Sequence, residues 1–173
     1  MQVLKQKKFE KLVISCDGGA ASGKTTGAKL ISKKYKLKFL SSGMLYRYAG
    51  YLILKHDPKK INTFLKTKFK NLNYRKLEKL NLHSSKISEF SSVIAKNNKI
   101  RKILKKFQID FSKKNRDCCI EGRDISTKIL PNSDLKFFFK CSLKTVFIFF
   151  AVLFETVEKN TNIVFVLFFE GSF

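Results

Sequence analysis

Cysteine and acidic residues are scarce in this sequence, and no apolar run is long enough to cross a membrane. The 4 cysteines, Cys16, Cys118, Cys119 and Cys141, form no C-x-x-C pair, so we expect neither a metal site nor a disulfide framework. All four stand in or beside apolar runs, as small buried residues of a reducing compartment do. The lysine-rich N-terminus has no apolar secretory segment, and we therefore expect a cytoplasmic protein with no membrane partner.

The shortage of acidic residues leaves a large excess of positive charge. In a chain of 173 residues, 36 lysines and arginines face 13 aspartates and glutamates, which gives a formal net charge of +23. Such an excess attracts polyanions, so a basic nucleic-acid-binding protein is one interpretation. Most of the basic residues, however, are lysines scattered among Asn, Ile and Phe, as expected of coding DNA rich in A and T. We therefore expect no nucleic-acid partner, and the length suits one domain with a small insertion.

What the sequence does contain is a phosphate-binding loop between a strand and a helix. An apolar run that ends at Cys16 predicts a buried strand, and a helical pattern begins at about Gly23. Between them, Gly18 and Gly23 are separated by four small residues and followed by Lys24 and Thr25, which is the P-loop pattern without a mismatch. The alternative interpretation is a glycine-rich turn that precedes a helix by chance.

The residues of this loop can bind a nucleoside triphosphate with its magnesium ion. Small residues let consecutive backbone N–H groups surround a phosphate, and the helix N-terminus adds a favourable field. Lys24 would contact the β- and γ-phosphates, and the Thr25 hydroxyl would bind Mg²⁺ as the metal ligand. We predict ATP and Mg²⁺ as cofactors, bound by Gly18, Gly19, Ala20, Ala21, Ser22, Gly23, Lys24, Thr25 and Thr26.

The remaining pattern is typical of an α/β protein with a parallel sheet. In residues 98–113, apolar side chains recur at offsets of 0, 3, 4, 7 and 11 from Ile100, which predicts one buried helical stripe. The Asp57-Pro58 pair predicts the end of the preceding helix. The predicted strands are residues 12–16, 38–40, 117–120 and 135–139, and the predicted helices include residues 23–36 and 98–113.

Three further motifs follow the P-loop. They are Ser42-Gly43-Met44-Leu45-Tyr46-Arg47, Ser91 to Ala95 with Lys99 to Arg101, and Glu121 to Thr127 with Leu130-Pro131. With these motifs, residues 10–142 resemble bacterial cytidylate kinases of the P-loop nucleoside monophosphate kinase family. The resemblance implies a three-layer P-loop α/β fold, in which residues 1–57 and 89–141 form the core and residues 58–88 form an inserted lobe that binds the nucleoside monophosphate.

The resemblance also implies ATP-dependent phosphorylation of CMP or dCMP by a monomer. In the family, the residues that match Ser42 and Arg47 hold the acceptor nucleotide, and the arginine contacts its phosphate, a task that a fork of N–H donors suits. Ser92, Arg101, Arg123 and Asp124 match positions that bind the rest of the acceptor, with Arg123 and Asp124 near the cytosine. The predicted catalytic residues are Lys24, Arg47 and Arg123.

Several of these residues have alternative interpretations. Arg47 could be a solvated helix residue, and Arg123 with Asp124 could be a surface pair. Glu121, where the family more commonly has aspartate, could hold the magnesium shell through water. Another small-molecule P-loop kinase stays an alternative for the whole chain.

The resemblance stops at Cys141. The family continues as Ser-x-x-x-Arg-Ala-x-Arg-Arg into a basic helix and a lid whose arginines clamp the transferring phosphoryl group. Residues 142–173 instead contain 8 of the 18 phenylalanines and no arginine. We interpret this aberrant apolar tail as the product of a shifted reading frame or a damaged gene, with the lid and the final strand absent or replaced. Residues 163–169 can form an edge strand by chance, and a catalytically dead nucleotide-binding remnant is a further alternative.

Overall fold

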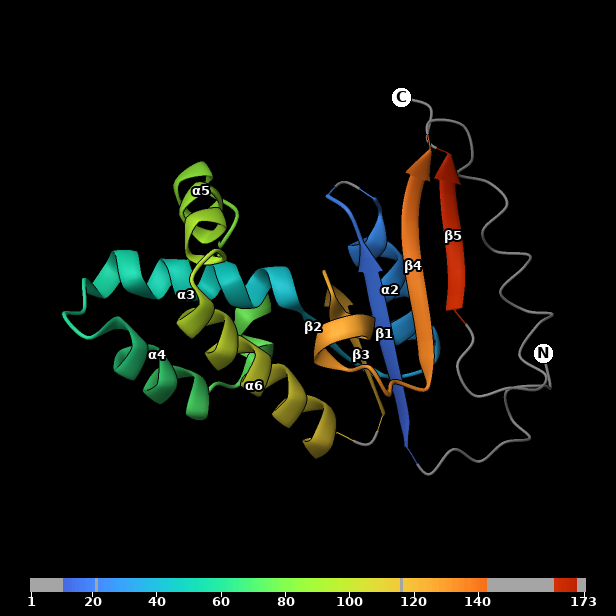
Figure 1. Cartoon of the computed structure of the whole chain (residues 1–173), viewed down its shortest axis with the longest axis horizontal. Helices are drawn as coiled ribbons and strands as arrows, with labels where there is room; N and C mark the ends of the chain where they lie inside the picture. Colours follow the sequence, from blue (N-terminus) through green and yellow to red (C-terminus); the bar gives the residue numbers. More distant parts are fainter. Residues whose placement is uncertain (1–10, 21, 116, 143–163, 171–173) are drawn as a thin grey trace. The chain divides into compact units, whose positions relative to one another are not determined.

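The computed structural model describes residues 11–20, 22–115, 117–142 and 164–170. It divides the chain into two compact units (Figure 1). Unit 1 comprises Met1–Phe39 and Ser112–Phe173, and unit 2 comprises Leu40–Phe111. The inserted lobe predicted at residues 58–88 lies inside unit 2. The basic lead-in before residue 11 and the apolar run from Val146 to Phe154 lie outside the described residues.

A five-stranded sheet organises unit 1, with the strand order β2-β3-β1-β4-β5. Its strands are β1 (Leu12–Gly18), β2 (Lys38–Ser41), β3 (Asp117–Gly122), β4 (Leu135–Ser142) and β5 (Val164–Glu170). The last two residues of β2 fall in unit 2. The central strand β1 pairs in parallel with both β3 and β4, and β4 pairs in parallel with β5. The prediction of an α/β fold around a parallel sheet is therefore confirmed, and the four predicted strands are all present.

The edge of this sheet beside β4 is formed by residues of the apolar tail. β5 pairs with β4 from Lys136 opposite Val164 to Ser142 opposite Glu170. The prediction that residues 163–169 can form an edge strand is confirmed. A strand far along the chain thus covers the backbone N–H and C=O groups of β4 that would otherwise form an open edge.

The core of unit 1 lies between the sheet and helix α2 (Lys24–Lys34), which begins at the lysine of the P-loop. The side chains of Ala28 and Ile31 are buried on the face of this helix that packs against the sheet. Gly27 faces the fully buried ring of Phe139, and a Cβ atom at this glycine would lie 2.8 Å from the Phe139 Cζ atom. Only glycine therefore allows the helix to approach β4 this closely.

Unit 2 is helical. Its elements are α3 (Ser42–His56), α4 (Ile61–Lys70), the 3₁₀ helix η1 (Tyr74–Lys79), α5 (Ser85–Ile94) and α6 (Asn98–Lys114), of which the last turn falls in unit 1. The predicted break after α3 is confirmed, because Asp57 caps it with φ 39° before Pro58. The predicted stripe of α6 is also confirmed: Ile100 and Leu104 are buried.

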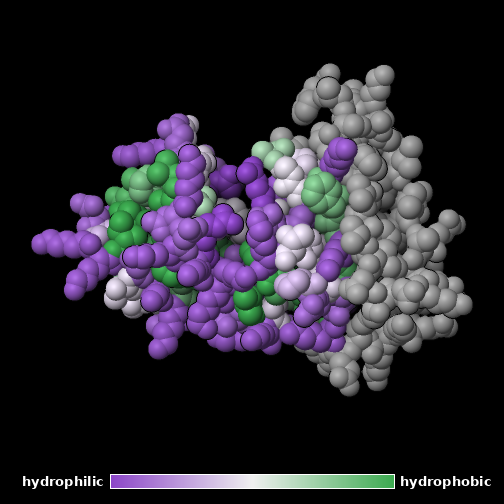
Figure 2. Space-filling view, viewed as in Figure 1, coloured by the Kyte–Doolittle hydropathy of each residue, from purple (hydrophilic) through white to green (hydrophobic). Residues whose placement is uncertain are grey.

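Most of the visible surface of unit 2 is hydrophilic. Purple side chains cover it in Figure 2, and green apolar side chains show between them over the region of α3 and α5. Leu54 and Val93 are among its exposed large apolar residues. Within the described part of the chain, no helix combines the length and apolarity needed to cross a bilayer.

Candidate functional site

The P-loop joins the central strand to the first helix of unit 1. β1 ends at the buried Gly18, where a Cβ atom would lie 2.6 Å from the carbonyl oxygen of Phe139 and 2.7 Å from the Ser22 hydroxyl oxygen. Gly23, directly before α2, has φ 73°, a left-handed conformation that glycine adopts without steric cost. Both glycines of the motif are thus required by the backbone itself. Ala21 lies outside the described residues.

Polar contacts within the loop hold it in a curved shape. The Lys24 ammonium donates to the carbonyl oxygen of Gly19 at 2.7 Å, and the Ser22 hydroxyl donates to the same oxygen at 3.0 Å. The side chains of Thr25 and Thr26 are exposed at the start of α2. Gly19 is also exposed, and a Cβ atom added to it would have no neighbour within 4 Å. Phosphate oxygens can replace the Gly19 carbonyl as the acceptor of the Lys24 ammonium, so these residues fit a triphosphate chemically.

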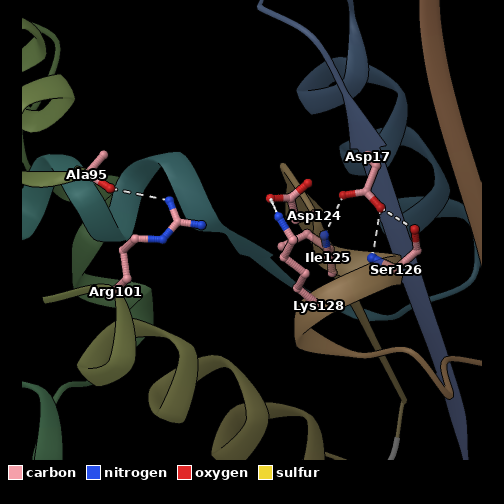
Figure 3. A network of polar contacts seen from close by, with 7 residues as sticks. All are labelled: Asp17, Ala95, Arg101, Asp124, Ile125, Ser126 and Lys128. Carbon is pink, nitrogen blue, oxygen red and sulfur yellow. Dashed lines mark hydrogen bonds and ion pairs between the residues drawn. The ribbon is translucent and has the colours of Figure 1, made fainter. Parts of the chain in front are cut away.

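Asp17, the residue before the P-loop, is a polar site that the sequence analysis missed. The residue is only 5% exposed, and its carboxylate accepts hydrogen bonds from the backbone N–H of Ile125 at 2.6 Å and of Ser126 at 2.8 Å. The Ser126 hydroxyl donates to it as well (Figure 3). A lone carboxylate at the end of an otherwise apolar strand was the signal that could have identified it, because buried charges need partners.

The segment that contains Arg123 and Asp124 links β3 to the π-helical turn η2 (Ile125–Ile129). Asp124 has φ 59°, a left-handed conformation that costs a non-glycine residue about 1–2 kcal/mol and that aspartate tolerates better than most. Its carboxylate forms an exposed ion pair with Lys128 at 3.0 Å (Figure 3), which contributes little to stability. Arg123 is exposed, so its guanidinium is accessible from solvent.

The pairing of β1 with β3 brings the P-loop strand and this segment together within unit 1. Asp17 stands opposite Gly122 in the register, and Cys16 stands opposite Glu121, whose side chain is 2% exposed. The buried Glu121 therefore lies beside the strand that leads into the loop. In the described part of the chain, no group of three His, Cys, Asp or Glu residues is placed to hold a metal ion.

Four of the predicted acceptor residues lie in unit 2. Ser42 is buried at the first position of α3, where the neighbouring Ser41 hydroxyl accepts from the Met44 N–H at 3.3 Å and caps the helix. The Nε atom of Arg47, one turn further along α3, is buried and has no hydrogen-bond partner among the described residues. A buried guanidinium N–H without a partner is costly, so Arg47 is not a plain solvated residue.

The other two acceptor candidates of unit 2 lie near the ends of α5 and α6. Ser92 is exposed, and its hydroxyl donates to the Ser88 carbonyl at 3.2 Å. Arg101 is also exposed, and its Nη1 atom donates to the Ala95 carbonyl at 3.3 Å (Figure 3). This bond ties the guanidinium to the end of α5, since Ala95 is the residue that caps that helix.

The cysteines beside the P-loop strand are structural. The Sγ atoms of Cys16 and Cys119 lie 3.6 Å apart in a hydrogen bond, and this bond together with burial raises the pKa of Cys16 well above its ordinary value. Burial raises the pKa of the neighbouring Cys118 to about 12. Cys16, Cys118 and Cys119 are all buried, which confirms the predicted burial of these three residues. At neutral pH the raised pKa makes Cys16 and Cys118 poor nucleophiles, because the thiolate is disfavoured. The Cys141 side chain lies outside the described residues.

A glycine loop that joins the central parallel strand to a helix beginning with Lys24-Thr25 defines a P-loop nucleotide-binding protein of the α/β class. Residues 14–146 match the model of the family described as cytidylate kinase. The chain belongs to the cytidylate kinase family.

Individual relatives agree with this assignment. Cytidylate kinase of Bartonella tribocorum is 38% identical over 138 residues, which cover 77% of this chain and 62% of the relative. Cytidylate kinase of Listeria monocytogenes is 30% identical over 149 residues, covering 78% of this chain and 66% of the relative. The bifunctional pantoate ligase/cytidylate kinase of Prochlorococcus marinus is 33% identical over 148 residues, which cover 76% of this chain and 29% of the relative. The chain thus matches about two thirds or less of the length of these relatives.

Proposed function

We propose that this chain phosphorylates CMP or dCMP to the diphosphate with ATP as the donor, in the cytoplasm and as part of pyrimidine nucleotide metabolism. The buried Nε atom of Arg47, which has no partner among the described residues, carries the proposal. It stands in the Ser42 to Arg47 motif, where an anionic phosphate would supply the missing acceptor. Family membership and the P-loop support the donor side. No membrane or nucleic-acid partner is needed, and a monomer suffices.

On the donor side, the proposal assigns ATP to residues 18–26. The backbone N–H groups of the loop would surround the phosphates, and Lys24 would leave the Gly19 carbonyl to contact the β- and γ-phosphates. Thr25 would be the direct protein ligand of Mg²⁺. When bound, the ion neutralises charge on the transferring phosphoryl group.

On the acceptor side, the proposal divides the nucleotide between two sets of residues. Ser42 and Arg47 would hold the nucleotide at its phosphate, while Ser92, Arg101, Arg123 and Asp124 would bind the rest of it, with Arg123 and Asp124 near the cytosine. A cytosine edge presents an amino group and a carbonyl group, so it needs both an acceptor and donors. Asp124 supplies the acceptor and the exposed Arg123 supplies the donors.

The first prediction tests the donor site. Replacing Lys24 by alanine removes a charge-assisted hydrogen bond to phosphate, so we expect the Kd for Mg·ATP to rise by about tenfold to a hundredfold. Isothermal calorimetry with a nonhydrolysable ATP analogue measures this. The control is Lys33→Ala, which removes an exposed lysine of the same helix and should leave the Kd unchanged. Equal affinities of Lys24→Ala and the natural chain would refute the assignment of the loop.

The second prediction tests the choice of acceptor. A site built to pair with a base edge leaves buried polar groups unpaired when the wrong base enters, so CMP should raise the unfolding temperature more than UMP or AMP does. Asp124→Asn should reduce this preference at least about tenfold in affinity.

The matched control for this prediction is Asp110→Asn. It changes the carboxylate of another exposed ion pair, with Lys106 at 3.1 Å, and should leave the preference intact. The cytidylate assignment fails if UMP or AMP protects the natural chain from thermal unfolding as well as CMP does.

A further inference from the structure

The Asp17 carboxylate connects two parts of unit 1 that the proposed function assigns to different nucleotides. It directly precedes Gly18, the first residue of the donor loop, and it accepts hydrogen bonds from Ile125 and Ser126, which directly follow the acceptor residues Arg123 and Asp124. These contacts span 108 and 109 positions of the sequence. Because the carboxylate is buried and accepts three hydrogen bonds, the Ile125–Ser126 backbone is fixed to the end of β1 (Figure 3).

The segment held by Asp17 has a backbone that needs support. Asp124 lies between two fixed points, the β3 ladder that ends at Gly122 and the anchored amides of Ile125 and Ser126. Its φ of 59° is unfavourable for a residue with a side chain and persists only where the surroundings enforce it. The exposed ion pair with Lys128 is too weak to do so. The buried Asp17 contacts hold this end of the turn, together with the hydrogen bonds that the Asp124 carbonyl oxygen accepts from the Lys128 and Ile129 amides.

We propose that Asp17 is a positioning residue for the acceptor base: it touches neither nucleotide and acts by holding Arg123 and Asp124 in the conformation that reads cytosine. This inference rests on the proposed function. It adds Asp17, a residue of the strand that leads into the ATP loop, to the residues that determine acceptor specificity. It also predicts that a change of Asp17 weakens acceptor binding but not ATP binding, even though Asp17 is adjacent in sequence to the ATP loop.

The test replaces Asp17 by asparagine and measures CMP and ATP affinities separately by calorimetry. Asparagine keeps the volume but presents one NH₂ group to a set of three donors, so at least one hydrogen bond to a charged acceptor is lost. We expect the Kd for CMP to rise about tenfold or more and the preference for CMP over UMP to fall, while the Kd for the ATP analogue changes less than about threefold.

A matched control separates positioning from general stability. Asp134 is a half-buried carboxylate of unit 1 that accepts from the Val13 N–H at 2.7 Å, near the other end of β1. Asp134→Asn therefore makes the same chemical change in a carboxylate that contacts the same strand, away from the acceptor segment. It should lower the unfolding temperature and leave both the CMP affinity and the preference for cytosine unchanged.

Two further measurements keep the test decisive. Hydrogen exchange should be faster at the Ile125 and Ser126 amides in Asp17→Asn and unaltered there in Asp134→Asn. If Asp17→Asn does not fold, Ser126→Ala removes only the hydroxyl donor and should weaken CMP binding about threefold without affecting ATP.

The outcomes distinguish this inference from the proposed function. A natural chain that binds the ATP analogue but shows no preference for CMP overturns the proposed function. A natural chain that prefers CMP, together with an Asp17→Asn protein that retains that preference or loses ATP and CMP affinity equally, overturns only the role of Asp17.

Discussion

A protein that carries residues 142–173 of this chain should phosphorylate CMP at least about 10³-fold more slowly than a variant in which a family lid segment replaces them. Phosphoryl transfer is catalysed mainly by positioning and charge neutralisation, and an arginine clamp contributes about 10³ to 10⁵ in rate. Residues 142–173 contain no arginine, so they cannot supply such a clamp to the transferring group. Steady-state rates of CDP formation by the two purified proteins measure the difference.

The control for this experiment is the same lid variant with its lid arginines changed to glutamine. Its rate should fall to that of the natural chain, because the lid segment keeps its length while the cationic clamp is removed. The replaced stretch includes β5, so thermal unfolding must first establish that every protein compared is folded. Comparable rates for the natural chain and the lid variant would mean that residues 142–173 are a working substitute for the lid.

Replacing Gly27 by alanine should destabilise unit 1 by about 1–3 kcal/mol, the cost of overpacking a dense core. Alanine is normally the better helix residue by about 0.5–1 kcal/mol, so the steric effect must reverse the usual sign. The new Cβ would lie 2.8 Å from Cζ of Phe139, whose ring is fully buried and cannot swing into solvent. Urea unfolding followed by circular dichroism gives the change in the free energy of unfolding.

The helix α3 offers a matched control for this substitution. At Gly50 an added Cβ would lie 3.5 Å from the Phe90 ring, an ordinary contact, so Gly50→Ala should be neutral or stabilise by up to about 1 kcal/mol. Combining Gly27→Ala with Phe139→Leu should cost less than the sum of the two single changes, since the smaller side chain makes room. Additive costs in the pair would contradict the steric explanation.

The parts of this molecule that the sequence predicted are those that neighbouring residues determine. The strand, loop and helix around Gly18 to Lys24 follow from the spacing of the glycines. The buried stripe of α6 follows from the helical period at which its apolar residues recur. The end of α3 follows from Asp57 and Pro58 because proline cannot continue a helix. In each case the cause lies within a few residues of its effect.

What the sequence did not predict depends on contacts between distant segments. Nothing near Asp17 in the chain shows that its carboxylate holds the Ile125 amide, which is 108 positions away. The requirement for glycine at position 27 exists only because the Phe139 ring faces it. The burial of the Arg47 Nε atom is likewise a property of the packed helices of unit 2, and local pattern could not separate it from a solvated arginine.

The strand order has a consequence for how the nucleotide loop comes into being. β1 lies at the centre of the sheet, and both of its neighbours come from the second half of the chain, β3 at Asp117–Gly122 and β4 at Leu135–Ser142. Pairing at such sequence separations requires loop closure before any stabilisation, which slows folding. During synthesis, residues 12–26 therefore leave the ribosome early yet have no partner strand until translation passes residue 117. The loop is among the first segments made and among the last to reach its shape, so variants that weaken β3 or β4 should reduce soluble yield through aggregation of the unpaired β1.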